Sequence, residues 1–202
     1  MLALGPHRAY PHHPAPIGAG RDEGSAQDAG EAGTCTREGA MGEEVTLREV
    51  RDDDLPIFFL HQSDPESNRL ASFPARDPAA FDAHWAKIRA DASIILRSIL
   101  VDGQVAGNLV SFEQGGEREV GYWLGREFWG RGVATSALAQ FLDIVTVRPL
   151  HAVLAPHNVA SRRVLEKCGF RFENEQGDEL RLVLIVPAAT AGSGLHRNSA
   201  LC

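Results

Sequence analysis

The chain has 202 residues, a formal net charge of −7, 44% hydrophobic residues and 23% charged residues, a composition typical of a soluble globular protein with one sizeable domain. This acidic balance argues against a nucleic-acid partner, because general nucleic-acid binding requires a basic surface that neutralises phosphates. No apolar run reaches the roughly 18–20 residues that cross a bilayer, so we expect no membrane partner. The three cysteines lack metal-ligand spacing and the amino-terminal stretch lacks an apolar signal core. We therefore expect a cytoplasmic protein without a metal.

The composition changes sharply near residue 41 and again after residue 187. Residues 1–42 are rich in Gly, Ala, Pro and polar side chains. Such a segment cannot bury enough apolar surface to offset about 1–2 kcal/mol of ordering entropy per residue. We therefore expect a disordered extension at 1–42, a folded domain at 43–187 and a disordered tail at 188–202. Because Met41 opens the first strand-like stretch, it is also a candidate for the working translation start.

Within the expected domain, strand-like runs alternate with helical patterns. The strands are expected at residues 45–50, 94–101, 105–112, 119–124, 151–154, 170–172 and 180–186. Four helices are expected. The first starts at Asp53 and the second covers 78–90. The third covers 132–147 with a stop at Pro149, and the fourth runs from Asn158 to Gly169. Asp102-Gly103 between two strand-like runs is a strong hairpin signal, since the turn needs positive φ. The order predicts one α/β domain with a mixed sheet.

The most informative stretch is the glycine-containing turn at 125–135, GREFWGRGVAT, between a strand and a helix. Backbone amides and the helix dipole at such a turn favour a phosphate. Gly125 and Gly130 have the spacing that begins a nucleotide-triphosphate P-loop, but Arg131 and Gly132 stand where that motif needs Lys and Ser/Thr. A dinucleotide fingerprint also fails, because Thr135 replaces its third glycine and no acidic residue follows the next strand. The alternative is a flexible connection between the strand and the helix that binds no ligand.

The segment Trp129-Gly130-Arg131-Gly132-Val133-Ala134 resembles the acetyl-CoA pyrophosphate loop of the GNAT N-acetyltransferases, usually written Q/R-x-x-G-x-G/A. The preceding EVGYWL strand and the NVASRRVLEKCGF segment at 158–170 are similar to the next two motifs of that family. The element order agrees from about residue 43 to residue 187. WGRGVA and NxxSxxVLEKxGF are most similar to the branch that contains the ribosomal-protein N-terminal alanine acetyltransferases.

The resemblance implies a mixed, mostly antiparallel sheet with helices on both faces, a splayed strand pair, and acetyl-CoA as the cosubstrate. The free backbone of the strand ending at Leu124 would pair with the pantetheine arm, and a backbone amide near 122–124 would hold the oxyanion. Asn158 would reach the cofactor arm besides capping its helix. For Ser161 the alternative is simple solvent exposure. The implied cofactor-binding residues are Tyr122, Trp123, Leu124, Trp129, Gly130, Arg131, Gly132, Val133, Ala134, Thr135, Asn158 and Ser161.

Two residues depart from the family pattern. Trp129 occupies the usual Gln/Arg position, but backbone amides make the phosphate contacts, so we expect binding to survive. Leu165 stands where many members carry a tyrosine that protonates the departing thiolate. With a thiol pKa of about 8.5, either water or another group protonates the sulfur, or the thiolate leaves unassisted.

The acceptor amine must lose a proton before it attacks. At pH 7 this costs about 4–5 kcal/mol for a lysine-like amine and about 1 kcal/mol for an α-amine, so a weak base serves an N-terminus more easily. Glu119 matches the position of a catalytic glutamate in some family members; the alternative is an outward-facing charge on a half-solvated strand. His157, His61 and His84 are weaker candidates for the base.

The acceptor pocket is expected from a loop at 61–76 and from the predicted hairpin. Trp85, Trp123 and Phe128 either line this pocket or, more commonly for such residues, belong to the core. Cys168 is expected to be inert packing.

The predicted function is acetyl transfer from acetyl-CoA to a primary amine, either a protein N-terminus or a small molecule such as a polyamine or an antibiotic. The alternatives are a degenerate CoA-binding regulatory module and a CoA-independent interaction domain. We expect a monomer or a homodimer.

Overall fold

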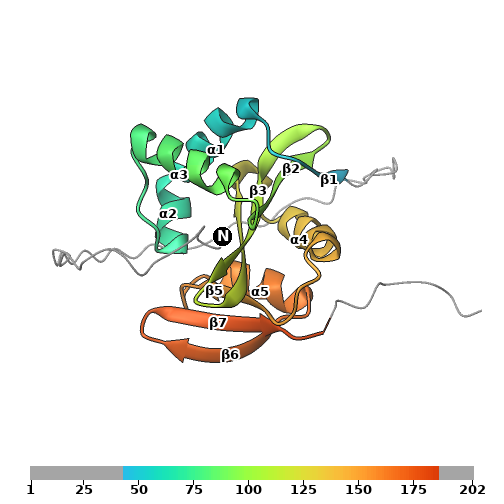
Figure 1. Ribbon diagram of the computed structural model, residues 1–202. Helices are drawn as coiled ribbons and strands as arrows, with labels where there is room; N and C mark the ends of the chain where they lie inside the picture. The colour runs from blue at the N-terminus through green and yellow to red at the C-terminus, as the bar shows by residue number, and fades with distance from the viewer. Residues whose placement is uncertain (1–42, 187–202) are drawn as a thin grey trace, which may run out of the picture. The chain divides into compact units, whose positions relative to one another are not determined.

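A seven-stranded sheet with the order β1-β2-β3-β4-β5-β7-β6 organises the computed structural model, which describes residues 43–186 (Figure 1). The strands are β1 (Val45–Arg48), β2 (Ile95–Val101), β3 (Gln104–Gln114), β4 (Glu117–Leu124), β5 (Leu150–Leu154), β6 (Arg171–Gln176) and β7 (Glu179–Leu184). The helices are α1 (Leu55–Gln62), α2 (Pro65–Ala71), α3 (Pro78–Ala90), α4 (Val133–Ile144) and α5 (Val159–Lys167), with short 3₁₀ turns at η1 (Asp52–Asp54) and η2 (Arg126–Phe128). The expected Met41 start and both tails lie outside the described residues.

One parallel pair interrupts an otherwise antiparallel sheet. The strands β4 and β5 pair in parallel at only two positions, Arg118 with Leu150 and Glu119 with His151. β4 then continues to Leu124 and β5 to Leu154 without a partner on that side. The prediction of a mixed, mostly antiparallel sheet with a splayed strand pair is therefore confirmed.

Helices cover both faces of the sheet, and each face has its own core. α1, α2 and α3 lie on one side and α4 on the other (Figure 1). The core on the α4 and α5 side includes Leu109, Leu138, Phe141, Leu142, Leu165 and Leu182. The core on the α1–α3 side includes Phe58, Ala71, Phe81, Trp85, Val110 and Trp123. Strand residues alternate between the two cores, as the pleat requires.

Several predicted boundaries follow local signals. The helix expected at 78–90 has those bounds, with Asp77 accepting a hydrogen bond from the Ala80 amide at its start. The hairpin turn has φ of +49° at Asp102 and +80° at Gly103, as predicted. In the described part of the chain, no helix is long and apolar enough to cross a membrane.

Two predictions about helices were wrong. The expected loop at 61–76 contains α2, which Asp64 caps by accepting from the Ser67 amide at 2.7 Å and which begins with Pro65. Ser and Asn residues made the segment look irregular, whereas the Asp-Pro-Glu start favours a helix. The helix α4 ends at Ile144 and not near Pro149, because Val145 turns to an extended conformation while its side chain stays buried in the core.

Candidate functional site

Beyond Glu119 and His151 the strands β4 and β5 no longer pair, and we call the space between them the gap. The Gly125 amide donates to the Ala106 carbonyl of β3 at 2.8 Å. A Cβ on Gly107 would lie 2.1 Å from the Trp123 carbonyl oxygen, so the Trp123 backbone also faces β3. Because backbone groups alternate along a strand, Tyr122 and Leu124 direct theirs toward the gap. The resemblance implied cofactor contacts for all three residues of 122–124, whereas the alternation directs only the backbone groups of Tyr122 and Leu124 toward the gap.

The loop from Gly125 to Gly132 is held by its own side chains. The Trp129 indole Nε1 donates to the Leu124 carbonyl at 3.0 Å. The Arg131 guanidinium donates to the Glu127 carbonyl at 3.0 Å and lies 5.4 Å from the ring centroid of Phe128. These two side chains thus bind backbone carbonyls at the start of the loop and stabilise its conformation.

The first turn of α4 presents amides without helical acceptors. Gly130 and Gly132 have φ of +74° and +80°, and a Cβ on either would meet no atom within 4 Å. Gly132 makes no side-chain cap bond, and the Ser136 amide donates to the Gly132 carbonyl at 3.0 Å. The amides of 133–135 precede that bond, so they need an acceptor from outside the helix. Such a glycine-flanked helix start suits a phosphate.

Asn158 and Ser161 lie together at the start of α5, and Ser161 contacts Tyr122 of β4. Asn158 is fully buried and accepts a hydrogen bond from the Ser161 amide at 3.2 Å. Ser161 is 1% exposed, so its predicted alternative of solvent exposure is wrong. Burial raises the pKa of Tyr122 well above its usual range, and a side-chain hydrogen bond with Ser161 only partly offsets this. The contact connects α5 to the part of β4 that borders the gap.

Glu119 lies where β4 and β5 last pair. It stands opposite Phe112 of β3 and His151 of β5, and only 8% of it is exposed. The alternative of a half-solvated surface charge is therefore wrong. Burial raises its pKa, Arg181 lowers it, and the carboxylates of Glu117 and Glu179 raise it. Across residues 43–186, no hydrogen bond to its carboxylate is formed.

The three candidate histidines occupy different surroundings. His61 Nε2 is 3.4 Å from Glu127 Oε1, and burial lowers its pKa. His84 packs edge-on against Trp85, and burial lowers its pKa to about 4. His157 Nε2 donates to the Arg69 carbonyl at 3.0 Å. Within the described residues, the partners of these three histidines are Glu127, Trp85 and Arg69, and none of the three pairs with Glu119.

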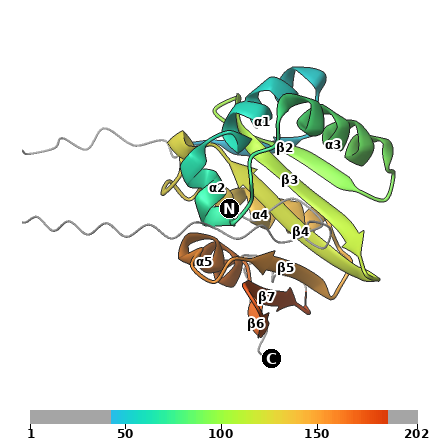
Figure 2. The same cartoon turned by 90° about the vertical axis from the view of Figure 1, so that its left-hand side faces the viewer.

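The helix α2, which the sequence interpretation missed, connects the ends of the two splayed strands. Asp64 at its start is 3.9 Å from Arg126, just after β4. Its other end accepts the hydrogen bond from His157, just after β5. α2 and the start of α5 are neighbours in Figure 2. The Asp64 cap was the signal that could have predicted this helix.

The remaining candidates belong to the core. Trp85 and Trp123 have no exposed surface and Phe128 is 7% exposed, which agrees with the core interpretation. Leu165 is also fully buried and brings no proton donor. Burial raises the pKa of the Cys168 thiol to about 11, as expected for inert packing. Within 43–186, no group of three or more potential metal ligands occurs.

The structure thus combines a parallel strand pair that splays apart with a glycine-flanked helix start, as the resemblance of the sequence motifs to the GNAT family implied. The chain belongs to the GNAT acetyltransferases: residues 44–171 match the family described as "Acetyltransferase (GNAT) domain".

Its relatives include acetyltransferases with different named substrates. "Putative ribosomal N-acetyltransferase YdaF" of Bacillus subtilis (strain 168) is 26% identical over 156 residues, 69% of this chain and 85% of that protein. The structure of Mycobacterium smegmatis RimJ in complex with CoA-disulfide is 25% identical, with a TM-score of 0.58 over 70% of this chain and 81% of that one. Vibrio cholerae spermidine N-acetyltransferase, solved with CoA and spermine, is 16% identical with a TM-score of 0.63 over 71% of this chain and 96% of that one, a likeness of fold.

Proposed function

We propose that this protein transfers an acetyl group from acetyl-CoA to a primary amine. The observation that carries the proposal is the opening of β4 away from β5 directly beside the uncapped start of α4. The RimJ relative, solved with a CoA derivative, and the other named N-acetyltransferases support CoA as the group that fills such a gap.

In this proposal the amides of Gly130 to Thr135 hold the pyrophosphate, and the gap-facing backbone of Tyr122 and Leu124 pairs with the pantetheine arm. Trp129 and Arg131 contribute through the loop backbone that their side chains support. Asn158 and Ser161 border the arm from α5. Acetyl-CoA supplies an activated thioester; these residues orient it and exclude water from one side.

Glu119 is the proposed general base. A carboxylate with a raised pKa is a better proton acceptor than an ordinary surface glutamate, and general bases contribute about 10²–10⁴-fold to rates. The amine nitrogen forms a bond to the acetyl carbon, its proton passes to Glu119 directly or through water, and the carbon–sulfur bond breaks. The amide of Tyr122 or Leu124 stabilises the oxyanion. Because Leu165 cannot donate a proton, the thiolate is protonated by water or leaves unassisted.

The test is CoA thiol release with a panel of primary amines, in parallel with binding of acetyl-CoA by calorimetry. Amine-dependent thiol release supports the enzyme. Binding without release for any amine supports the alternative, a degenerate CoA-binding regulatory module. No binding at all contradicts both. The acceptor classes in the panel are protein N-termini and small amines; the cytoplasmic location and the monomer or homodimer stay predictions.

A further inference from the structure

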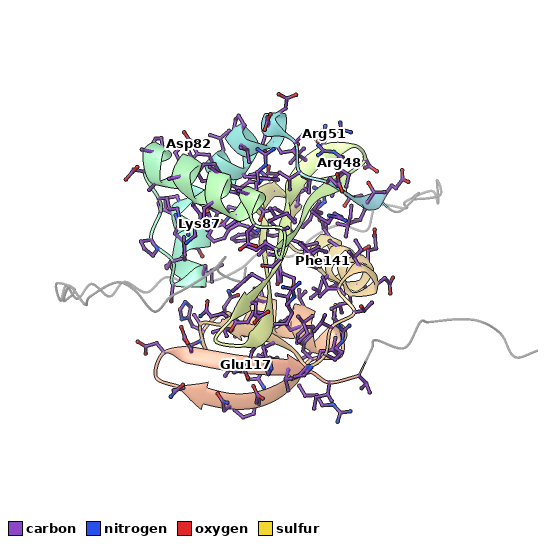
Figure 3. The ribbon with its side chains drawn as sticks, in the orientation of Figure 1. Arg48, Arg51, Asp82, Lys87, Glu117 and Phe141 are labelled. Atoms are coloured by element: carbon purple, nitrogen blue, oxygen red, sulfur yellow. The ribbon has the colours of Figure 1, made fainter. Side chains whose placement is uncertain are left out.

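Arg181 of β7 binds side chains from three other strands, at the level where β4 and β5 pair. Its Nη2 donates to a carboxylate oxygen of Glu117 on β4. Its Nε donates to Glu173 of β6 at 2.8 Å and to His151 Nδ1 of β5 at 3.3 Å. Figure 3 labels Glu117 where β4 begins, close to β7. We call these four residues the arginine network.

The proposed base lies between two members of the arginine network. Glu119 follows Glu117 by two residues on β4, so the two side chains point to the same face of the sheet. Across the parallel pair, Glu119 stands opposite His151. Its carboxylate forms no hydrogen bond within residues 43–186, so Arg181 acts on it as a nearby charge and not as a bonded partner.

Arg181 is the permanent cation of the network, because a guanidinium stays protonated at every pH that a folded protein meets. The hydrogen bond from Arg181 to His151 Nδ1 makes Nε2 the proton-bearing nitrogen of the neutral ring. Nε2 lies 3.7 Å from Glu117 Oε1. Three partners hold the guanidinium, so its charge has a fixed place beside Glu119.

The charges around Glu119 have opposite effects on its ionisation. Burial, which is the largest effect, raises its pKa, and the carboxylates of Glu117 and Glu179 raise it as well, whereas Arg181 lowers it. Phe112, its neighbour on β3, carries no charge. The titratable or charged side chains that surround Glu119 on this face are Glu117, His151, Glu173, Glu179 and Arg181. Without Arg181, Glu119 would ionise in a buried place beside other carboxylates.

From this arrangement we propose that Arg181 is a positioning residue for acetyl transfer. Its guanidinium keeps the buried Glu119 in the ionised form that accepts the proton of the amine. The inference rests on the proposed function and adds to it a residue that does not touch the reacting atoms.

The experiment follows the ionisation of Glu119 directly, in the full chain without any ligand. The carboxyl carbon of Glu119 is titrated by ¹³C NMR, and its resonance is assigned by its absence from the spectrum of Glu119→Gln. Two neutral variants are prepared, because Arg181→Gln keeps an amide donor and Arg181→Met keeps an apolar stem, and either folded protein serves. The titration midpoint of Glu119 should move to higher pH by about one pH unit, since the loss of a nearby opposite charge disfavours the carboxylate.

Two further variants separate the effect of charge from other effects. Arg181→Lys keeps the positive charge and should move the midpoint much less, although lysine lacks the planar fork that binds several partners. Arg171→Gln is the matched control, because it removes the same charge from the same hairpin. Arg171 stands opposite Val183, so β7 separates it from His151. Arg171→Gln should leave the midpoint unchanged.

The pH profile of thiol release gives a second readout. The neutral variants should lose about tenfold more in kcat on the acidic limb of the profile than on the alkaline plateau, because Glu119 is protonated at a higher pH. A residue with only a structural role would lower kcat by the same factor at every pH.

An unchanged midpoint in a folded neutral variant would overturn the inference. Equal shifts for Arg181→Gln and Arg171→Gln, or for the neutral variants and Arg181→Lys, would also overturn it. The titration needs neither acetyl-CoA nor an amine, so the two proposals can fail separately. A shifted midpoint without thiol release for any amine supports the effect of Arg181 on Glu119 and contradicts the proposed function. Thiol release with an unchanged midpoint does the opposite.

Discussion

A side chain placed on the glycine turn before α4 should block the proposed phosphate site. Gly132 and Gly103 share a φ of +80°, and a Cβ on either meets no atom within 4 Å. The residues differ in place: Gly132 begins α4 at the proposed phosphate site, whereas Gly103 turns the β2–β3 hairpin. Gly132→Glu and Gly103→Glu should therefore have the same backbone cost, about 1–2 kcal/mol for a left-handed conformation. Each variant should melt a few degrees lower, at about 2–4 °C per kcal/mol.

Binding of acetyl-CoA should separate the two variants. A charge-assisted amide–phosphate hydrogen bond contributes about 1.5–3 kcal/mol, so blocking two of them costs about 3–6 kcal/mol, or roughly 10²–10⁴-fold in Kd. Isothermal calorimetry should show this loss for Gly132→Glu and near wild-type binding for Gly103→Glu. A folded Gly132→Glu protein that binds as tightly as the wild type would refute the assignment of the phosphate to this loop.

Three other substitutions test the site and its support. Glu119→Gln should lower kcat by about 10²–10⁴-fold; because burial raises the pKa of Glu119, the wild-type rate should fall with decreasing pH at a higher pH than for an ordinary glutamate. A raised carboxyl pKa favours the protonated form, whose stabilisation is lost as the pH rises, so Glu119→Gln should melt no lower than the wild type at pH 7. A lower melting temperature of Glu119→Gln at pH 7 would contradict a raised pKa of Glu119. Asp54 is buried; burial alone would raise its pKa, but hydrogen bonds from Arg48, Ser98 and the Arg51 amide lower it to about 2. The charged form therefore contributes about 2–3 kcal/mol above about pH 4, which is lost as the pH falls toward 2, and Asp54→Asn should flatten this pH dependence in denaturant titrations. Asn158→Ala should cost about 0.5–2 kcal/mol of stability through the lost cap and weaken acetyl-CoA binding as well; a stability loss alone would leave Asn158 as a cap only.

Local sequence signals predicted the elements that they directly encode. Asp77-Pro78 starts α3, Asp102-Gly103 makes the hairpin turn, and Asn158 caps α5 by accepting from Ser161. The glycine turn could be placed between a strand and a helix for the same reason, since each of these signals acts within a few residues. The missed helix α2 carried such a signal at Asp64, but the polar composition around it outweighed the cap in the interpretation.

Contacts between distant segments could not be predicted in this way. Glu119 lies beside Phe112 and His151, and two of the three charged groups that shift its pKa, Arg181 and Glu179, lie on β7, about sixty residues later. The order of the strands in the sheet decides which residues become neighbours, and that order cannot be read from local patterns in a single sequence.

A crystal structure of the full chain with acetyl-CoA would show directly whether the cofactor binds between β4 and β5. We expect the pantetheine arm between β4 and β5, along the gap-facing backbone of Tyr122 and Leu124, with pyrophosphate oxygens within hydrogen-bond distance of the amides of 130–135. The acetyl carbon should lie on the Glu119 side of the gap. A pyrophosphate bound elsewhere, with these amides left to water, would contradict the central claim.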